Sequence, residues 1–155
     1  MALTYLLQKS FSNAQIFKGE NRAVIVPRPH LDKFIEYLNQ IKDKIDIGIF
    51  STASSFYLST VLSNVIPWAI GNCVFIWDIA YCDFNSGMLA KDLRKVEKEF
   101  GYSLENIKMI DDQDIVLPES LRIPAIPFNV QNIHLAKNDT ELLRLINCIE
   151  VFISY

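Results

Sequence analysis

Short apolar segments alternate along this chain with segments whose apolar residues recur at helical spacing. This alternation constrains the fold more than any other feature of the sequence. Strands are predicted at residues 23–26, 45–50, 73–80, 107–110 and 123–128. Helices are predicted at 29–42, 56–63, 90–100 and 140–152, with a turn at 83–87. Strands and helices in this order predict an α/β fold: a Rossmann-like parallel sheet with helices on both faces.

Two adjacent aspartates, Asp111 and Asp112, end the apolar run 107–110. Open α/β folds build their sites at the carboxyl edge of the sheet, where such a strand ends. Two carboxylates so close repel each other, so a cation usually neutralises the pair, and oxygen ligands suit Mg²⁺. The alternative is a solvated turn, since Asp-Asp-Gln-Asp is also ordinary loop composition.

Length and composition exclude several classes of protein. At 155 residues the chain is expected to form one domain over 1–155. A net charge of −3 provides no basic surface for nucleic acid. No apolar run is long enough for a transmembrane helix, and the first residues do not resemble a signal peptide. The three cysteines form no C-x-x-C pair, so neither a zinc site nor a disulfide framework is predicted. We therefore expect a reducing compartment, the cytosol.

Further candidate site residues follow the predicted strands. Ser51 and Thr52 come directly after the strand at 45–50, where a hydroxyl and backbone N–H groups could hold an oxyanion. The alternative is that this hydroxyl-rich turn only caps the next helix. Lys91 is predicted at a helix start, either balancing a phosphate or as an ordinary solvated lysine. Phe56 and Tyr57 flank the Ser51 turn and could line a substrate groove.

The order of these residues is similar to that in the haloacid dehalogenase superfamily. That superfamily places a Ser or Thr after its second core strand, then a Lys, then an acidic pair. The sequence more closely resembles the NLI-interacting-factor, or small CTD-phosphatase-like, branch. The segments that carry the resemblance are Arg28-Pro-His-Leu-Asp-Lys-Phe34, Phe50-Ser-Thr-Ala-Ser54, Lys91-Asp-Leu93, Ile110-Asp-Asp112 and Asp139-Thr-Glu-Leu-Leu143. They run in one collinear order over residues 23–152.

This resemblance implies a fold and a chemistry. It implies a small β insert around residues 66–90. It also implies transfer of a phosphate from a phosphoprotein to an aspartate, followed by hydrolysis. Ser51, Thr52 and Lys91 would bind the phosphate, and Asp111 and Asp112 would hold Mg²⁺. A phosphoprotein or another protein is the implied partner, in the cytosol or alternatively the nucleus.

The sequence departs from the family at the catalytic motif. The attacking aspartate belongs to an Asp-x-Asp-x-Thr motif before Arg28, but residues 1–27 contain no Asp, and Glu20 is a poor substitute. The motif could lie upstream of residue 1 or be replaced. Two hypotheses follow: a pseudophosphatase, or an active Mg²⁺-dependent phosphatase represented without its first strand. The missing aspartate is normally also a metal ligand, so the Mg²⁺ site should be weakened.

Two expectations about the sheet follow from that departure. The motif strand normally sits in the middle of the sheet, so residues 2–7, or a partner, should fill its place. The strands ending at Phe50 and Ile110 are predicted to be neighbours in one parallel sheet. Ser51, Lys91 and Asp111 would then come together at its carboxyl edge.

Overall fold

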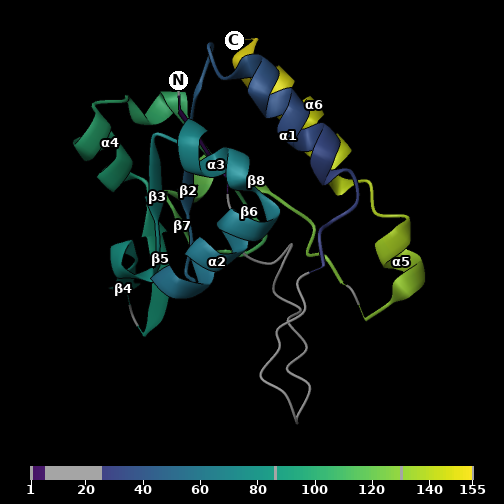
Figure 1. The fold of residues 1–155 in the computed structure, drawn as a ribbon. Coiled ribbons are helices and arrows are strands. Elements are labelled where there is room, and N and C mark those ends of the chain that lie inside the picture. Colours follow the sequence, from purple (N-terminus) through teal and green to yellow (C-terminus); the bar gives the residue numbers. More distant parts are fainter. Residues whose placement is uncertain (1, 6–25, 86, 130, 155) are drawn as a thin grey trace.

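A five-stranded parallel sheet forms the centre of the molecule, in the order β3-β2-β1-β6-β8. The structure is a computed structural model that describes residues 2–5, 26–85, 87–129 and 131–154 (Figure 1). The strands are β1 (Ala2–Tyr5), β2 (Asp46–Phe50), β3 (Phe75–Trp77), β6 (Ile107–Asp111) and β8 (Arg122–Pro124). The predicted α/β class with a parallel sheet is therefore confirmed.

Strand β1 fills the central position of this sheet. Its register places Ala2 opposite Asp46 and Ile107, and Tyr5 opposite Ile49 and Ile110. The prediction that the start of the chain occupies this position is confirmed for residues 2–5, while residues 6 and 7 lie outside the described part. The prediction that β2 and β6 are neighbours is wrong, because β1 separates them and pairs with both.

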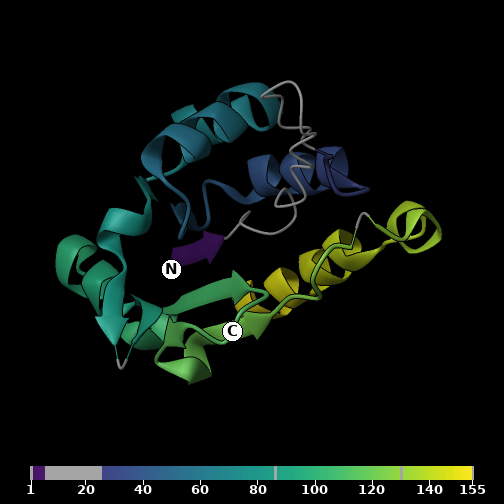
Figure 2. The same ribbon diagram turned by 90° about the horizontal axis from the view of Figure 1, so that it is seen from below.

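Side chains on the two faces of the sheet enter two separate cores. Successive strand residues point to opposite faces, so Ile47, Ile49 and Ile110 enter one core and Phe50 and Met109 the other. The first core is covered by α1 (Leu31–Ile41), α2 (Ser55–Val65), α3 (Pro67–Asn72) and α6 (Glu141–Ile153), and the second by α4 (Arg94–Phe100). Figure 1 shows α1 and α6 side by side, and in Figure 2 α4 again lies at the opposite end of the molecule from α5 (Ile133–Lys137). Helices therefore cover both faces, as predicted.

A second, smaller sheet stands beside the first. It contains β4 (Asp83–Asn85), β5 (Met88–Asp92) and β7 (Val116–Leu117), with β4 antiparallel and β7 parallel to β5. The β insert predicted around 66–90 is thus displaced toward the C-terminus, because α3 and β3 occupy its first half. Three single turns of 3₁₀ helix complete the description: Ile79–Tyr81, Leu104–Asn106 and Glu119–Leu121.

Two local predictions in this region are wrong. Residues 83–87 were expected to form only a turn, but 83–85 form β4. Lys91 was expected at a helix start, but it lies in β5, and α4 begins at Arg94. The N–H groups of Lys91 and Leu93 donate to the carbonyls of Ile115 and Leu117, both at 2.7 Å. Helical periodicity could not reveal this pairing, because the partner strand is distant in the sequence. The strand predicted at 23–26 falls almost entirely outside the described residues.

Gly48 of β2 lies directly against its neighbour in β3. A Cβ built at Gly48 would lie 2.3 Å from Cζ of Phe75. The Phe75 ring has little room to move, because it packs 4.5 Å from the Trp77 ring and 5.1 Å from the Phe100 ring. We expect Gly48→Ala to destabilise the domain by about 1–3 kcal/mol through overpacking. Urea denaturation measures the change.

The matched control is Gly71→Ala in α3, where a new Cβ meets nothing within 4 Å. Alanine is favoured over glycine inside a helix by roughly 0.5–1 kcal/mol, so this variant should be slightly more stable than the wild type. Equal effects of the two substitutions would contradict the proposed crowding at Gly48.

Candidate functional site

A buried ion pair lies at the carboxyl end of β6. The ammonium Nζ of Lys91 lies 2.9 Å from Oδ2 of Asp111, and both side chains are fully buried. The pair joins the two sheets, since Lys91 belongs to β5 and Asp111 is the last residue of β6. Burial lowers the pKa of Lys91 to about 8, although the attraction of Asp111 opposes that shift. Two of the residues predicted for the site are therefore in direct contact.

The contacts of Asp111 bear on whether the acidic pair fits Mg²⁺. Oδ1 of Asp111 accepts a hydrogen bond from the Gln113 N–H at 3.0 Å, and Oδ2 accepts one from Lys91. Both oxygens therefore already have donors inside the chain, and the Lys91 ammonium already neutralises part of the acidic charge. Asp112 follows and is half-buried. No group of three or more His, Cys, Asp or Glu side chains in the described residues could hold a metal ion. These contacts do not by themselves form a resident Mg²⁺ site.

The Ser51 turn follows β2 at the same edge of the sheet. The Ser51 N–H donates to the Trp77 carbonyl at 2.8 Å, and Ser51 Oγ accepts from the Ala53 N–H at 3.0 Å. Ser54 Oγ accepts from the Tyr57 N–H at the start of α2, so the turn does cap this helix. Two N–H groups of the turn therefore donate within the chain. The hydroxyl hydrogens of buried Ser51 and half-buried Thr52 are further donors that could meet an anion.

Cys82 connects the Ser51 turn to the ion pair. Its Sγ lies 3.7 Å from the Ser51 carbonyl oxygen. Burial raises the pKa of the Cys82 thiol, and the nearby positive charge of Lys91 acts against that shift. In the sequence this residue was only one of three cysteines without a C-x-x-C partner; all three are free and half-buried. The sequence analysis did not single out Cys82, which lies between the 3₁₀ turn at 79–81 and β4.

Phe56 and Tyr57 lie on the first turn of α2, as expected from their place after the Ser51 turn. The Phe56 side chain is exposed, whereas Tyr57 is half-buried and packs against the core under α1 and α2. The two side chains therefore have different surroundings. Their predicted role in lining a substrate groove stays a prediction.

A second buried cluster joins two segments that carry the sequence resemblance. The guanidinium of Arg28 donates to both carboxylate oxygens of Asp139, at 2.7 and 2.6 Å, and to the Ile126 carbonyl at 2.8 Å. It also lies 5.4 Å above the Phe128 ring. Burial is the largest single influence and raises the pKa of Asp139, but the hydrogen bonds from Arg28 and the Glu141 N–H and the positive charges nearby together outweigh it, so the pKa is lowered overall. The segment before α1 is thereby held to the start of α6.

The fold and these contacts define a class of protein. The protein has a parallel sheet with helices on both faces, and an acidic pair at the carboxyl end of β6 in contact with a lysine of the second sheet, as the resemblance to the haloacid dehalogenase superfamily implies. The family model described as NLI interacting factor-like phosphatase matches residues 4–155. The chain therefore belongs to the NLI interacting factor-like phosphatase family, as the sequence resemblance predicted.

Solved structures support the same fold. The chain is similar to a variant of the fission yeast RNA polymerase II CTD phosphatase Fcp1 bound to beryllium fluoride, with a TM-score of 0.66 and 14% identity. The match covers 99% of this chain and 62% of that one. A second structure of Fcp1, described as an essential RNA polymerase II CTD phosphatase, has a TM-score of 0.58 and 14% identity, with 96% and 49% covered. The chain thus spans 49–62% of the length of these structures.

None of the curated proteins compared with this chain matches it. None of the helices in the described residues combines the length and the apolar run needed to cross a membrane.

Proposed function

We propose that this domain is a pseudophosphatase: it binds a phosphoryl group, carried by a phosphoprotein partner, and does not hydrolyse it. One observation carries the proposal. The strand between β2 and β6, where the family places its attacking aspartate, reads Ala2-Leu-Thr-Tyr5 and contains no carboxylate. Covalent catalysis requires such a nucleophile to form the phosphoenzyme. The remainder of the resembling constellation, Lys91 beside Asp111 and the Ser51 turn, is still present.

The retained residues suit binding. The Lys91 ammonium and the hydroxyls of Ser51 and Thr52 can attract and orient a phosphoryl group at the sheet edge. Neither hydroxyl has a histidine base among its contacts to activate it as a substitute nucleophile. From the family resemblance we also propose a phosphoprotein partner and a location in the cytosol or nucleus. We propose further that residues 1–155 form one domain.

The assignment predicts phosphate or vanadate binding without turnover. Purified protein with millimolar Mg²⁺ should not hydrolyse an aryl phosphate or a phosphopeptide above background. Calorimetric titration should detect vanadate binding, and removing the ammonium in Lys91→Met/Asp111→Asn should weaken it about tenfold, a loss of about 1.4 kcal/mol. The double variant removes both charges, so no buried charge is left alone.

The control is Lys98→Met, which removes an exposed lysine of α4 and should leave vanadate binding unchanged. Turnover that disappears in the double variant would instead favour the alternative, an active Mg²⁺-dependent phosphatase with another carboxylate as nucleophile. Absence of any phosphate or vanadate binding would contradict the proposed phosphoryl-binding role.

The effect of Mg²⁺ on thermal stability tests separately whether the acidic pair binds a metal ion. Members of this family are expected to use Mg²⁺, but both Asp111 oxygens already have donors here. We therefore expect melting temperatures in millimolar Mg²⁺ and in EDTA to agree. A functional Mg²⁺ site would add about 2.7 kcal/mol at a hundredfold excess over its dissociation constant. A rise in melting temperature that Asp111→Asn abolishes would show that the acidic pair binds the metal after all.

A further inference from the structure

The surface of α2 and α3 is free of charge. No residue from 47 to 77 is Asp, Glu, Lys, Arg or His, although much of this segment faces solvent. Three large apolar side chains project from it: Phe56 is 83% exposed, Ile70 55% and Val74 43%. Typical soluble domains contain about 25% charged residues, most of them at the surface. Depletion of charge together with exposed aromatic and aliphatic side chains is typical of the centre of a protein interface.

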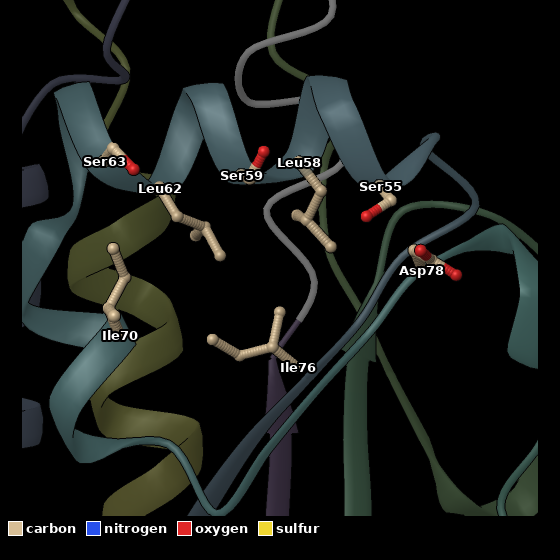
Figure 3. A pocket seen from close by; sticks show the side chains of 8 residues that line it. All are labelled: Ser55, Leu58, Ser59, Leu62, Ser63, Ile70, Ile76 and Asp78. Atoms are coloured by element: carbon tan, nitrogen blue, oxygen red, sulfur yellow. The ribbon is translucent and has the colours of Figure 1, made fainter.

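A groove crosses this surface between α2 and the edge of the main sheet. Its volume is about 240 Å³. Figure 3 shows Leu58 and Leu62 pointing from α2 toward Ile76 of β3, with Ile70 of α3 closing one end. Ser55, Ser59 and Ser63 lie along the α2 side at four-residue spacing, so they share one helix face. Small hydroxyl side chains there leave room for another backbone to approach.

The groove has one charged lining residue. Asp78, directly after β3, lies at the end near Ser55, opposite the end formed by Ser63 and Ile70 (Figure 3). Its Oδ1 accepts from the Ala80 N–H at 2.9 Å, which fixes the carboxylate at the groove end. An occupant that fits should therefore be apolar along the groove and cationic where it reaches Asp78.

We propose that the α2–α3 groove binds a short apolar segment of a protein partner that ends in a lysine or arginine. From Ser55 to Ser63 the helix rises about 12 Å, which matches about four residues of extended peptide. Two or three aliphatic side chains would contact Leu58, Leu62 and Ile76, and the cation would pair with Asp78.

The charge pattern argues against two other occupants. Anionic membranes attract surfaces rich in Lys and Arg, and residues 47–77 contain neither. A symmetric dimer would place the same face on both sides of the interface. It would then provide no cation for Asp78, since this face contains none.

Phage-displayed random peptides, panned against the whole chain after depletion on the Ile70→Glu variant, would test the proposal. Selected sequences should contain two or three apolar residues with Lys or Arg at one end. Fluorescence polarisation with the synthetic peptides should show binding about tenfold weaker to Ile70→Glu. Asp78→Asn should weaken binding about fivefold, as expected for a partly exposed ion pair, and still cap Ala80. Val151→Glu, an exposed position on α6, is the matched control and should bind like the wild type.

Melting curves establish that each variant is folded before binding is compared. Three outcomes would overturn the proposal: selected peptides that bind Ile70→Glu equally well, peptides without a preference for a basic residue, or no enriched peptides. Light scattering that shows a dimer dissociated by Ile70→Glu would assign the groove to a second copy of the chain. Binding to phosphatidylcholine vesicles that Ile70→Glu abolishes would assign it to a membrane. Either result also rejects the peptide partner.

Discussion

Lys91→Met is expected to destabilise the domain by about 3–5 kcal/mol, the usual cost of removing one partner from a buried ion pair. The reason is the carboxylate that remains. Asp111 is fully buried, and without the ammonium at 2.9 Å its charge would be left in a low-dielectric interior. Urea denaturation at neutral pH measures the loss as a shift of the midpoint with an unchanged slope.

The double variant Lys91→Met/Asp111→Asn separates the charge effect from the packing effect. Asparagine keeps an oxygen to accept the Gln113 N–H, and methionine keeps most of the lysine volume. Because both charges are gone, the double variant should recover most of the lost stability, as buried pairs replaced by neutral groups often do. A double variant as unstable as Lys91→Met alone would mean that the pairing with Asp111 is not what Lys91 contributes.

Arg28→Met is expected to cost about 2–4 kcal/mol. This lies between the cost of a hydrogen bond to a charged group and that of breaking a fully buried pair. Arg28 is 3% exposed and Asp139 14%, so part of the carboxylate would be solvated after the change. The control is Arg94→Met, whose side chain is exposed and whose ion pair with Asp92 should therefore contribute far less stability than the Arg28–Asp139 pair.

The Arg28 contribution should depend on pH in a defined direction. The pKa of Asp139 is lowered in the folded protein, so the pair stabilises the fold above the ordinary Asp pKa of about 4. That stability is lost as the pH falls through the lowered folded value. The gap between wild type and Arg28→Met should therefore narrow in acid. A gap that stays constant down to the acid transition would show that Arg28 acts through packing alone.

Elements with strong local signals were predictable from the chain. The buried strand at 46–50 is a near-continuous apolar run, and the buried side chains of α1 recur at helical spacing. The last helix was also placed to within about a residue at each end. Its start is held by Oδ1 of Asp139, which accepts a hydrogen bond from the Glu141 N–H.

The site was predictable only as a set of residues. Their order along the chain indicated that Ser51, Lys91 and Asp111 belong together, and the structure places Lys91 against Asp111. The predicted position of Lys91 at a helix start was wrong, however, because Lys91 reaches Asp111 from a strand of the second sheet. That sheet depends on pairing between β5 and β7, and local periodicity contains no information on such distant partners. Cys82 was missed for the same reason.

By itself, then, the amino-acid sequence determined the α/β class, the family and the absence of an aspartate from residues 1–27, since these depend on residue identity and local spacing. Only the tertiary structure decided what those residues do to one another. It placed β1 between β2 and β6, paired Arg28 with Asp139 across the chain, and supplied Asp111 with donors on both oxygens. Contacts of this kind form between distant segments brought together by packing of the core. Burial then gives the charges among them their large effects, because water no longer screens them.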